Sequence, residues 1–291
     1  MTSSTLQRPT SLGGCATLAC LWEATAAKPG NVHRGADFED MTFVDFLASA
    51  AVIGPVMDRC EQLGLGGTVL QAVEATRRTV GRNTNLGTLL LIAPLAMARG
   101  DVEKASAIVR DASQEDAGQI YQAIRTAQPG GLGEVERGDV AGEPDLSLFE
   151  AMQLAADRDL VARQYAGGFA EVADAVEHLD NHLVYNAALN DAIVLTQLLL
   201  LSRHGDSLVA RKLGPAASQD IASRAASVLA AYQQNRDEYY RAVADFDFWL
   251  RADGHRRNPG TTADLLAAVL FVMLVQDRLS WPVTFYGSPP T

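Results

Sequence analysis

Cysteine is scarce in this chain of 291 residues, which contains only Cys15, Cys20 and Cys60. Three is an odd number, and no two of them form a Cys-x-x-Cys pair. The sequence therefore favours neither a disulfide framework nor a thiolate zinc site. Cys15 and Cys20 lie in apolar sequence with helical spacing, and we interpret them as small core residues.

Basic residues are also in deficit. The chain has 24 Lys and Arg against 35 Asp and Glu, which gives a formal net charge of −11. A general nucleic-acid-binding protein needs basic surface to displace counterions, so we expect no nucleic-acid partner. A phosphorylated small molecule stays open as a substrate, because acidic residues can hold Mg²⁺ and Mg²⁺ can hold phosphates.

The sequence also lacks an apolar window of about 18 residues that could span a bilayer. Residues 187–201 come closest, but Asn190 and Asp191 interrupt them. The N-terminus lacks the charged and then apolar layout of a secretory signal. We therefore predict a cytoplasmic protein with no membrane partner.

Alternation of apolar and polar residues over a strand length is rare, whereas apolar residues at helical spacing cover most of the chain. With 48% hydrophobic residues, there is ample material for a core. We predict an all-α protein, a single-domain bundle of about a dozen helices with a central polar cleft. We assign residues 1–10 to a flexible N-terminus, 11–280 to the domain and 281–291 to a C-terminal tail. The predicted helical segments are 12–27, 43–63, 69–80, 86–98, 102–111, 117–127, 148–158, 169–175, 183–202, 217–233, 238–251 and 262–279.

Four polar segments interrupt this apolar chain, and the first covers residues 28–41. It contains His33, Asp37 and Asp40, which a turn or a helix start can bring together. Carboxylates are natural Mg²⁺ ligands, usually one or two per ion, so this segment is a candidate metal site. The alternative is that its acidic residues only favour the following helix N-terminus. Glu23, just over one turn upstream, is either a surface residue or a site carboxylate.

The second segment, residues 77–87, places Arg82, Asn83 and Thr84 in front of an apolar helix. Asn and Thr are good N-caps, and a helix N-terminus beside an Arg is an anion site. An ordinary capped helix accounts for Asn83 and Thr84, but it accounts less well for Arg82 together with Gly87.

The third segment, residues 186–212, ends with Asp206 at a helix start, followed by Arg211 and Lys212. On spacing alone, Asp206 is an N-cap. The fourth segment, residues 256–264, places Asp264 at capping-box distance from a Thr. It is either that cap alone or a backbone anion cradle with Asp264 facing a site.

Taken in order, these segments resemble the motifs of the triphosphoribosyl-dephospho-CoA synthase family. Its members make the precursor of the prosthetic group of citrate lyase and malonate decarboxylase. The resemblance runs from about residue 15 to about residue 275. The matching stretches are Glu23 with Lys28-Pro29-Gly30 and Asp40-Met41, Gly81-Arg82-Asn83-Thr84-Asn85-Leu86-Gly87 in part, Asp206-Ser207 with Ala210-Arg211-Lys212, and Pro259-Gly260-Thr261-Thr262-Ala263-Asp264-Leu265-Leu266.

The chain departs from the family pattern at two points. Asn85 and Leu86 stand where the family has a His-Lys pair, and Leu cannot supply the point charge of a Lys. The third motif also differs from that of the citrate-lyase enzymes. It looks more like a branch found with tetrahydromethanopterin-type one-carbon pathways. These departures favour a changed substrate within the same fold.

In the family reaction, the ribose 2′-hydroxyl of dephospho-CoA displaces the adenine of ATP. The resemblance therefore implies a Mg²⁺-dependent transferase with ATP and a second small nucleotide as substrates. Our hypothesis for the residues has three parts. It names Glu23 and Asp206 as catalytic residues; Lys28, His33, Arg82, Asn83, Thr84, Arg211 and Lys212 as substrate- or phosphate-binding residues; and Asp37, Asp40 and Asp264 as metal ligands.

Two alternatives stay open at this stage. One is the same fold acting on another phosphorylated or cofactor-precursor substrate of one-carbon cofactor biosynthesis. The other is a non-catalytic helical protein that binds nucleotides or serves as a scaffold. Trp249, Trp281 and Phe285 would support a homodimer if they are exposed, but they could equally belong to the core.

Overall fold

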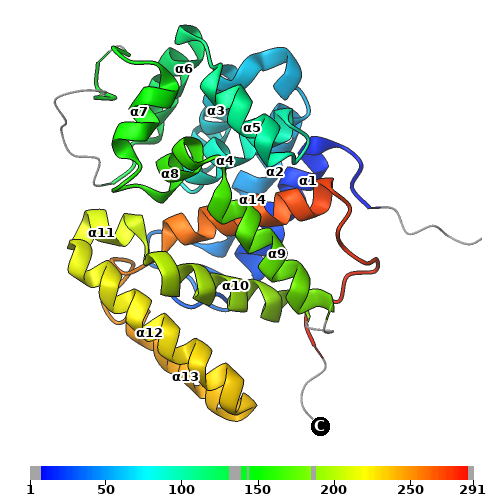
Figure 1. Ribbon diagram of the computed structural model, residues 1–291, viewed down its shortest axis with the longest axis vertical. Helices are drawn as coiled ribbons and strands as arrows, with labels where there is room; N and C mark the ends of the chain where they lie inside the picture. The colour runs from blue at the N-terminus through cyan, green and yellow to red at the C-terminus, as the bar shows by residue number, and fades with distance from the viewer. Residues whose placement is uncertain (1–7, 131–138, 143, 185–187, 288–291) are drawn as a thin grey trace, which may run out of the picture.

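The computed structural model describes residues 8–130, 139–142, 144–184 and 188–287, and its architecture is all-α, as predicted (Figure 1). The described residues form 14 helices and no strand. The helices are α1 (Leu12–Thr25), α2 (Phe43–Met57), α3 (Cys60–Val80), α4 (Leu86–Met97), α5 (Val102–Arg110), α6 (Gln114–Ala127), α7 (Leu148–Ala155), α8 (Leu160–Gly167), α9 (Ala170–Val184), α10 (Leu189–His204), α11 (Ser207–Leu213), α12 (Pro215–Gln234), α13 (Arg236–Arg251) and α14 (Gly260–Val275).

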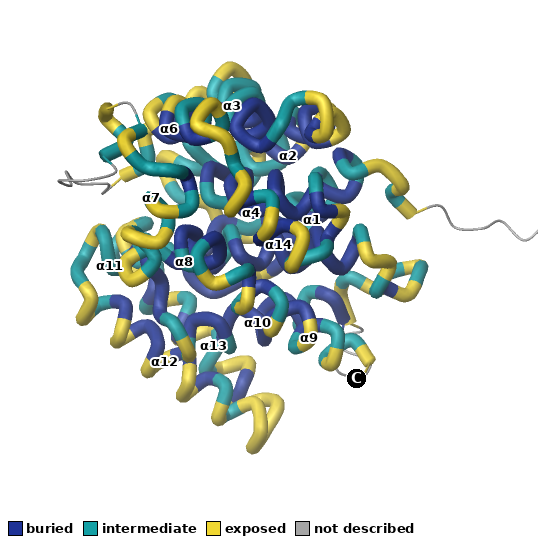
Figure 2. The backbone as a smooth tube through the Cα atoms, turned by 45° about the horizontal axis from the view of Figure 1, so that its top comes forward, coloured by how far each residue is buried: buried dark blue, intermediate teal, exposed yellow. Residues whose placement is uncertain are grey.

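Two apolar helices, α4 and α14, lie at the centre of the molecule, where Figure 2 shows them mostly buried. They pack against each other, and α14 also packs against α1 and α9. A helix that is hydrophobic on every side is stable only when other elements surround it, so their sequence dictates this central place. Both helices carry polar residues only near their N-terminal ends, which positions those ends for a site.

A proline inside α4 shows how the core satisfies its polar groups. Pro94 has no N–H, so the carbonyl of Leu90 one turn earlier loses its helical donor. The hydroxyl of Tyr165, which is fully buried, donates to that carbonyl at 2.6 Å. The helix therefore continues through the proline without an unpaired buried acceptor.

The remaining helices cover the central pair from two sides. Helices α1, α2, α3 and α6 pack together on one side, and α9, α10, α12 and α13 on the other. The second group has a smaller core of its own, which includes Leu198, Ile221 and Phe246. Helices α12 and α13 form a long pair at the lower edge of Figure 1.

Glycines in α3 account for a predicted break in the helical chain. We predicted a break at residues 64–67, and Gly64 has φ 70° and ψ 177°, a non-helical conformation that separates residues 60–63 from the rest of α3. A second break, at Asp58 and Arg59, was not predicted. A Cβ on Gly66 would lie 2.6 Å from Cα of Asp116, so the small residue permits close packing of α3 on α6.

Two short helices, α8 and α11, were not among the predicted segments, although the predicted N-cap at Asp206 does begin α11. They have 8 and 7 residues, too few for a hydrophobic period to stand out. Helix α9 extends to Val184, well beyond the predicted end at residue 175, and α10 begins at Leu189. The predicted segment 183–202 therefore spans the end of α9, residues outside the described part, and most of α10.

The residues assigned to a C-terminal tail pack on the domain as far as they are described. The carbonyl of Thr284 accepts from the N–H of Leu189 at 3.0 Å. The ring of Trp281 packs 6.0 Å from that of Trp22 on α1. In the part of the chain that is described, no helix has the length and apolarity needed to cross a membrane.

Candidate active site

A cavity of about 600 Å³ lies where helices from distant parts of the sequence meet. Its wall is formed by the second half of α1, the N-terminal ends of α4, α8 and α14, and residues of α2, α3, α6, α7 and α11. All four predicted polar segments contribute to it, which confirms the predicted central polar cleft. The predicted site residues that line the cavity are Glu23, Asp40, Arg82, Asn83, Thr84, Arg211, Lys212 and Asp264.

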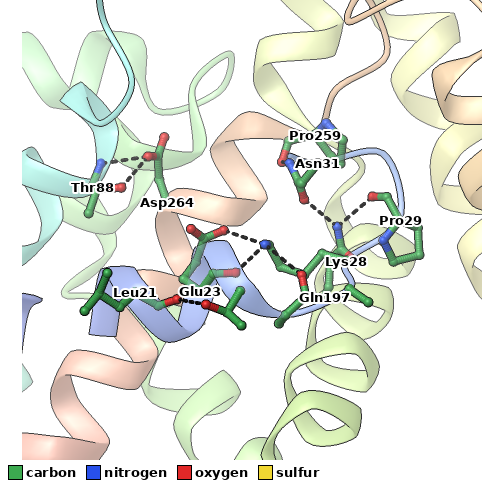
Figure 3. A network of polar contacts seen from close by, with 12 residues as sticks. Leu21, Glu23, Lys28, Pro29, Asn31, Thr88, Gln197, Pro259 and Asp264 are labelled. Atoms are coloured by element: carbon green, nitrogen blue, oxygen red, sulfur yellow. Dashed lines mark hydrogen bonds and ion pairs between the residues drawn. The ribbon is translucent and has the colours of Figure 1, made fainter. Parts of the chain in front are cut away.

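Glu23 and Lys28 form a buried ion pair beside the cavity (Figure 3). Nζ of Lys28 lies 3.0 Å from Oε1 of Glu23, and it also donates to the backbone carbonyls of Glu23 and Ala26. The Lys28 side chain is fully buried. We predicted that Lys28 binds phosphate, but its donors are used inside the protein and it does not line the cavity, so it holds Glu23 in place.

The charge state of Glu23 reflects two opposing effects. Burial raises the pKa of its carboxyl group above the ordinary value, and the charge and hydrogen bond of Lys28 reduce that rise without cancelling it. A carboxylate with so little water around it depends on its partner cation to stay ionised. Lys28 therefore favours the ionised form of a carboxyl group that lines the cavity.

Residues 29–31, which follow Lys28, are tied to two other elements. The side-chain amide of Gln197 on α10 donates to the carbonyl of Pro29 at 3.0 Å and to Oδ1 of Asn31 at 2.8 Å. Asn31 in turn donates to Oδ1 of Asn258 at 2.6 Å, just before α14. Gly30 has φ 76°, and a Cβ there would meet Leu250 at 2.7 Å. The Lys-Pro-Gly motif is thus a structural clamp between α1, α10 and α14.

Asp264 is the fifth residue of α14, just after its first turn, and points towards the first turn of α4 (Figure 3). Its Oδ1 accepts from both the N–H and the hydroxyl of Thr88, at 2.8 and 2.7 Å. Burial raises the pKa of Asp264 to about 7; the Thr88 bonds oppose the rise and the charge of Glu23 adds to it. A carboxyl group that titrates near neutrality can take up and release a proton under physiological conditions.

Gly87 makes room for this carboxylate, which is a role that the sequence did not reveal. A Cβ on Gly87 would lie 2.1 Å from Oδ2 of Asp264. We expect Gly87→Ala to displace the carboxylate and lower kcat by about 10²-fold, as for other small misplacements of catalytic groups. The measurement is product formation under saturating substrate.

The matched control is Gly118→Ala in the middle of α6, where a Cβ would meet nothing within 4 Å. That change should leave kcat as it is and stabilise the protein by about 0.5–1 kcal/mol. If Gly87→Ala is as active as the control, Asp264 does not need its observed position.

The structure gives Asp206 a different place from the one predicted. We expected a catalytic residue, but Asp206 is fully buried and does not line the cavity. Its oxygens accept from four donors: the N–H groups of Leu208 and Val209, and the N–H and hydroxyl of Thr262. Acceptors that are fully used inside the protein indicate a structural role for Asp206, and its catalytic role stays a prediction that this geometry does not favour.

The three predicted metal ligands do not form one cluster. Asp37 is exposed and accepts from the N–H of Phe43 at the start of α2. Asp40 pairs with His255 at 2.9 Å, and Asp264 binds Thr88 on the other side of the cavity wall. Among the described residues, no group of three His, Cys, Asp or Glu side chains could hold a metal ion. The residues therefore do not fit a preformed Mg²⁺ site.

The predicted anion cradle at the helix N-termini is occupied by the protein itself. The first-turn N–H groups of α4 and α14 already bind Asp264 and Asp206. Oδ1 of Asn83 accepts from the N–H of Leu86 at 3.1 Å, as expected for a cap. Thr84 is 2.6 Å from the hydroxyl of Ser49. The N–H groups of Thr88 and Thr262 are therefore not free to bind an anion.

Of the other predicted phosphate ligands, His33 and Arg211 are held by neighbours. His33 lies outside the cavity lining and accepts from the N–H of Gly35 at 3.2 Å. Burial and the cations Arg251 and Lys28 lower the pKa of His33 to about 4, so it is neutral at pH 7. Arg211 forms an ion pair with Asp159, the N-cap of α8.

Four cavity-lining cations are left without an ion pair in the described part of the chain: Arg77, Arg82, Arg158 and Lys212. Arg82 and Lys212 were predicted, whereas Arg77 and Arg158 were missed. Arg77 belongs to a polar segment that we recognised, but its neighbour Arg78 looks the same in sequence. Only the helical rotation of α3 decides which of the two faces the cavity.

Comparisons with known proteins identify the family to which the chain is similar. A model of the family described as ATP:dephospho-CoA triphosphoribosyl transferase matches residues 9–283. The chain is also similar to a crystal structure from Archaeoglobus fulgidus that carries the provisional name triphosphoribosyl-dephospho-CoA synthase. That match has 26% identity and a TM-score of 0.61 over 79% of this chain and 98% of the other. No curated protein matches the chain.

Proposed function

Because the chain belongs to the ATP:dephospho-CoA triphosphoribosyl transferase family, we propose that it transfers the triphosphoribosyl group of ATP to a ribose hydroxyl of dephospho-CoA. The C1′–N bond to adenine breaks and a bond forms between C1′ and the attacking oxygen. Adenine leaves with the bonding electrons and takes up a proton, while the proton of the hydroxyl goes to a base. Such a transfer needs neutralisation of the triphosphate, a negative charge near the sugar and a base for the hydroxyl.

The observation that carries this proposal is the gathering of unpaired cations in one cavity of an acidic protein. The chain has a net charge of −11, yet Arg77, Arg82, Arg158 and Lys212 face the same cavity without an acidic partner among the described residues. Unpaired cations that face a cavity are the natural ligands of phosphate groups. A polyphosphate substrate would neutralise them.

We assign the other two requirements, a base and a negative charge near the sugar, to two carboxylates. Asp264, with a pKa of about 7, accepts the proton of the attacking hydroxyl. Glu23 stays ionised through Lys28 and stabilises the positive charge that develops on the ribose. Their charges already interact across the cavity, because Glu23 contributes to the raised pKa of Asp264. Mg²⁺ dependence stays a prediction, and no step depends on it.

One wall of the cavity is apolar. It is formed by α6, α7 and α8 and includes Ile124, Met152, Leu154 and Val161. Leu154 is 53% exposed, the only large hydrophobic residue of the described lining that is so exposed. An uncharged part of a nucleotide, such as a base or the pantetheine arm, would cover it.

The test is to incubate the purified protein with ATP, Mg²⁺ and dephospho-CoA and to measure free adenine by chromatography. Adenine that appears only when dephospho-CoA is present is the expected result. No ATP binding and no adenine would refute the proposal and favour a scaffold role.

One observation keeps a second candidate function open. Asn85 and Leu86 line the cavity where the resemblance leads us to expect His and Lys, and Asn85 donates to Thr76 at 3.1 Å. The cavity therefore lacks a cation at this point, which favours another phosphorylated acceptor. ATP binding without adenine release in the presence of dephospho-CoA would support this candidate.

Adjacent arginines on α3 provide a test of the cationic wall. Arg77 lines the cavity, whereas Arg78 is exposed and pairs with Glu74 at 3.3 Å. We expect Arg77→Gln to raise KM for ATP by about tenfold to a hundredfold, since a hydrogen bond to a charged group contributes about 1.5–3 kcal/mol. Arg78→Gln should change KM by less than about twofold, because exposed ion pairs contribute little. Equal effects of the two changes would contradict the assignment.

A further inference from the structure

Two buried carboxylates in this protein make the same contact with the first turn of a helix. Oδ2 of Asp206 accepts from the N–H and the hydroxyl of Thr262, at 2.8 and 2.9 Å. Oδ1 of Asp264 accepts from the N–H and the hydroxyl of Thr88, at 2.8 and 2.7 Å. Thr262 and Thr88 are each the third residue of their helix, α14 and α4. The contact therefore serves as a joint between elements.

The two joints share one helical turn. Thr262, which receives the first contact, is two residues before Asp264, which makes the second. A continuous path therefore runs from Asp206 through the first turn of α14 to Asp264 and on to α4. Any movement of that turn changes where the Asp264 carboxylate lies in the cavity.

Asp206 is also held in place by contacts with α11 and α12. Its own N–H donates to the hydroxyl of Ser218 at 2.9 Å, and its Oδ1 caps α11 through Leu208 and Val209. The adjacent Ser207 lies 3.1 Å from the hydroxyl of Thr261, which gives α14 a second tie to the same junction. A buried group with every acceptor used acts as an anchor and not as a reactant.

We propose that Asp206 is a positioning residue, which holds the first turn of α14 so that the Asp264 carboxylate keeps its place in the cavity. The role of Asp264 in catalysis rests on the proposed function. The mechanical link between Asp206 and Asp264 does not. The two can therefore fail separately in an experiment.

The most selective change is Asp206→Asn. Asn is a good N-cap, so its side-chain oxygen can still accept from the N–H groups of α11. Its amide group cannot accept from the N–H of Thr262, so only the joint to α14 is lost. We expect kcat to fall by about 10²-fold, the effect of a small misplacement of a catalytic group. KM for ATP should change by less than about twofold, because the cations that would bind the phosphates lie on other turns.

A second pair of variants separates the effect of Asp206 on the position of Asp264 from the effect of its charge. The charge of Asp206 also raises the pKa of Asp264, so Asp206→Asn alters that pKa directly as well. Thr262→Val keeps the charge and the N–H but removes the hydroxyl, and Thr262→Ser keeps both donors. We expect kcat to fall by about tenfold in Thr262→Val, the loss of one charged hydrogen bond, and to stay near wild type in Thr262→Ser. Asp101→Asn, at the exposed cap of α5, controls for the loss of a cap carboxylate.

The decisive readout needs no substrate. In protein labelled with ¹³C at the aspartate carboxyl carbons, the Asp264 signal is assigned through Asp264→Asn and titrated with pH. The charged groups that act on it are Glu23 and Asp206, and burial is the largest cause of its raised pKa. If Thr262→Val loosens the turn, water reaches the carboxylate and its titration midpoint falls from about 7 towards its ordinary value.

A fall in the midpoint for Thr262→Val, with Thr262→Ser and Asp101→Asn unchanged, supports the proposal. An unchanged midpoint in Thr262→Val, or an equal loss of kcat in Asp101→Asn, overturns it. If the wild-type protein releases no adenine with any acceptor, the proposed function fails. The titration then still decides whether Asp206 positions Asp264.

Discussion

Exchanging Asp264 for Asn is expected to lower kcat by about 10²–10⁴-fold while leaving the helix content unchanged, because the change removes a general base but no structural contact. The side-chain oxygen of Asn can still accept from the N–H and hydroxyl of Thr88, as Oδ1 of Asp264 does. Adenine release measures the activity, and far-ultraviolet circular dichroism measures the helix content. Asp101→Asn, which alters an exposed cap of α5, is the matched control.

The same residue sets an expected pH dependence. A base must be ionised, so kcat of the wild type should rise with pH through the pKa of about 7. For stability the sign is opposite. Since its folded-state pKa lies above the unfolded value of 3.8, the folded carboxyl binds a proton where the unfolded one does not. The free energy of unfolding should therefore fall as pH rises from about 4 to about 7, and this contribution should vanish in Asp264→Asn. Full activity of the variant across this range would remove Asp264 from the site.

Helical periodicity was enough to predict the fold class and most of the helices. The continuous apolar stretches predicted at 86–98 and 262–279 became the central helices α4 and α14, because a helix without a polar face must be surrounded. The limits of the method appear where local sequence is ambiguous. The glycines at 64–67 indicated a break, and Gly64 is non-helical, but the earlier break at Asp58 and Arg59 has no Gly or Pro to reveal it.

The sequence also predicted which segments form the site, but it predicted less well what each residue does there. Polar groups in an apolar chain indicate a shared location, and all four segments do contribute to the cavity. Whether a charged residue faces the cavity or the interior depends on side-chain direction, which spacing alone does not give. Lys28 and Asp206 illustrate the point, because both turned inwards and became parts of the scaffold. Some of their partners, such as the carbonyl of Ala26 and the N–H of Thr262, are backbone groups that no motif displays.

The buried pair of Glu23 and Lys28 leads to the largest expected effect on stability. Lys28→Met keeps most of the side-chain volume but leaves the Glu23 carboxylate without its cation. Removing one partner of a buried ion pair costs about 3–5 kcal/mol, because the remaining charge has neither water nor a counterion. Urea unfolding at pH 7 measures the loss. Arg99→Ala, which breaks the exposed pair with Glu61 at 2.8 Å, should cost no more than about 1 kcal/mol.

A double variant, Glu23→Gln with Lys28→Met, separates the structural role of this pair from its chemical role. Neutralising both partners removes the uncompensated charge, so we expect most of the stability lost in Lys28→Met to return. Adenine release should stay low, because Gln cannot stabilise a positive charge on the ribose. A double variant that is both stable and active would show that the ion pair serves the fold alone. A stable but inactive one would show that the protein carries a buried charge, which costs free energy to desolvate, for the sake of the reaction.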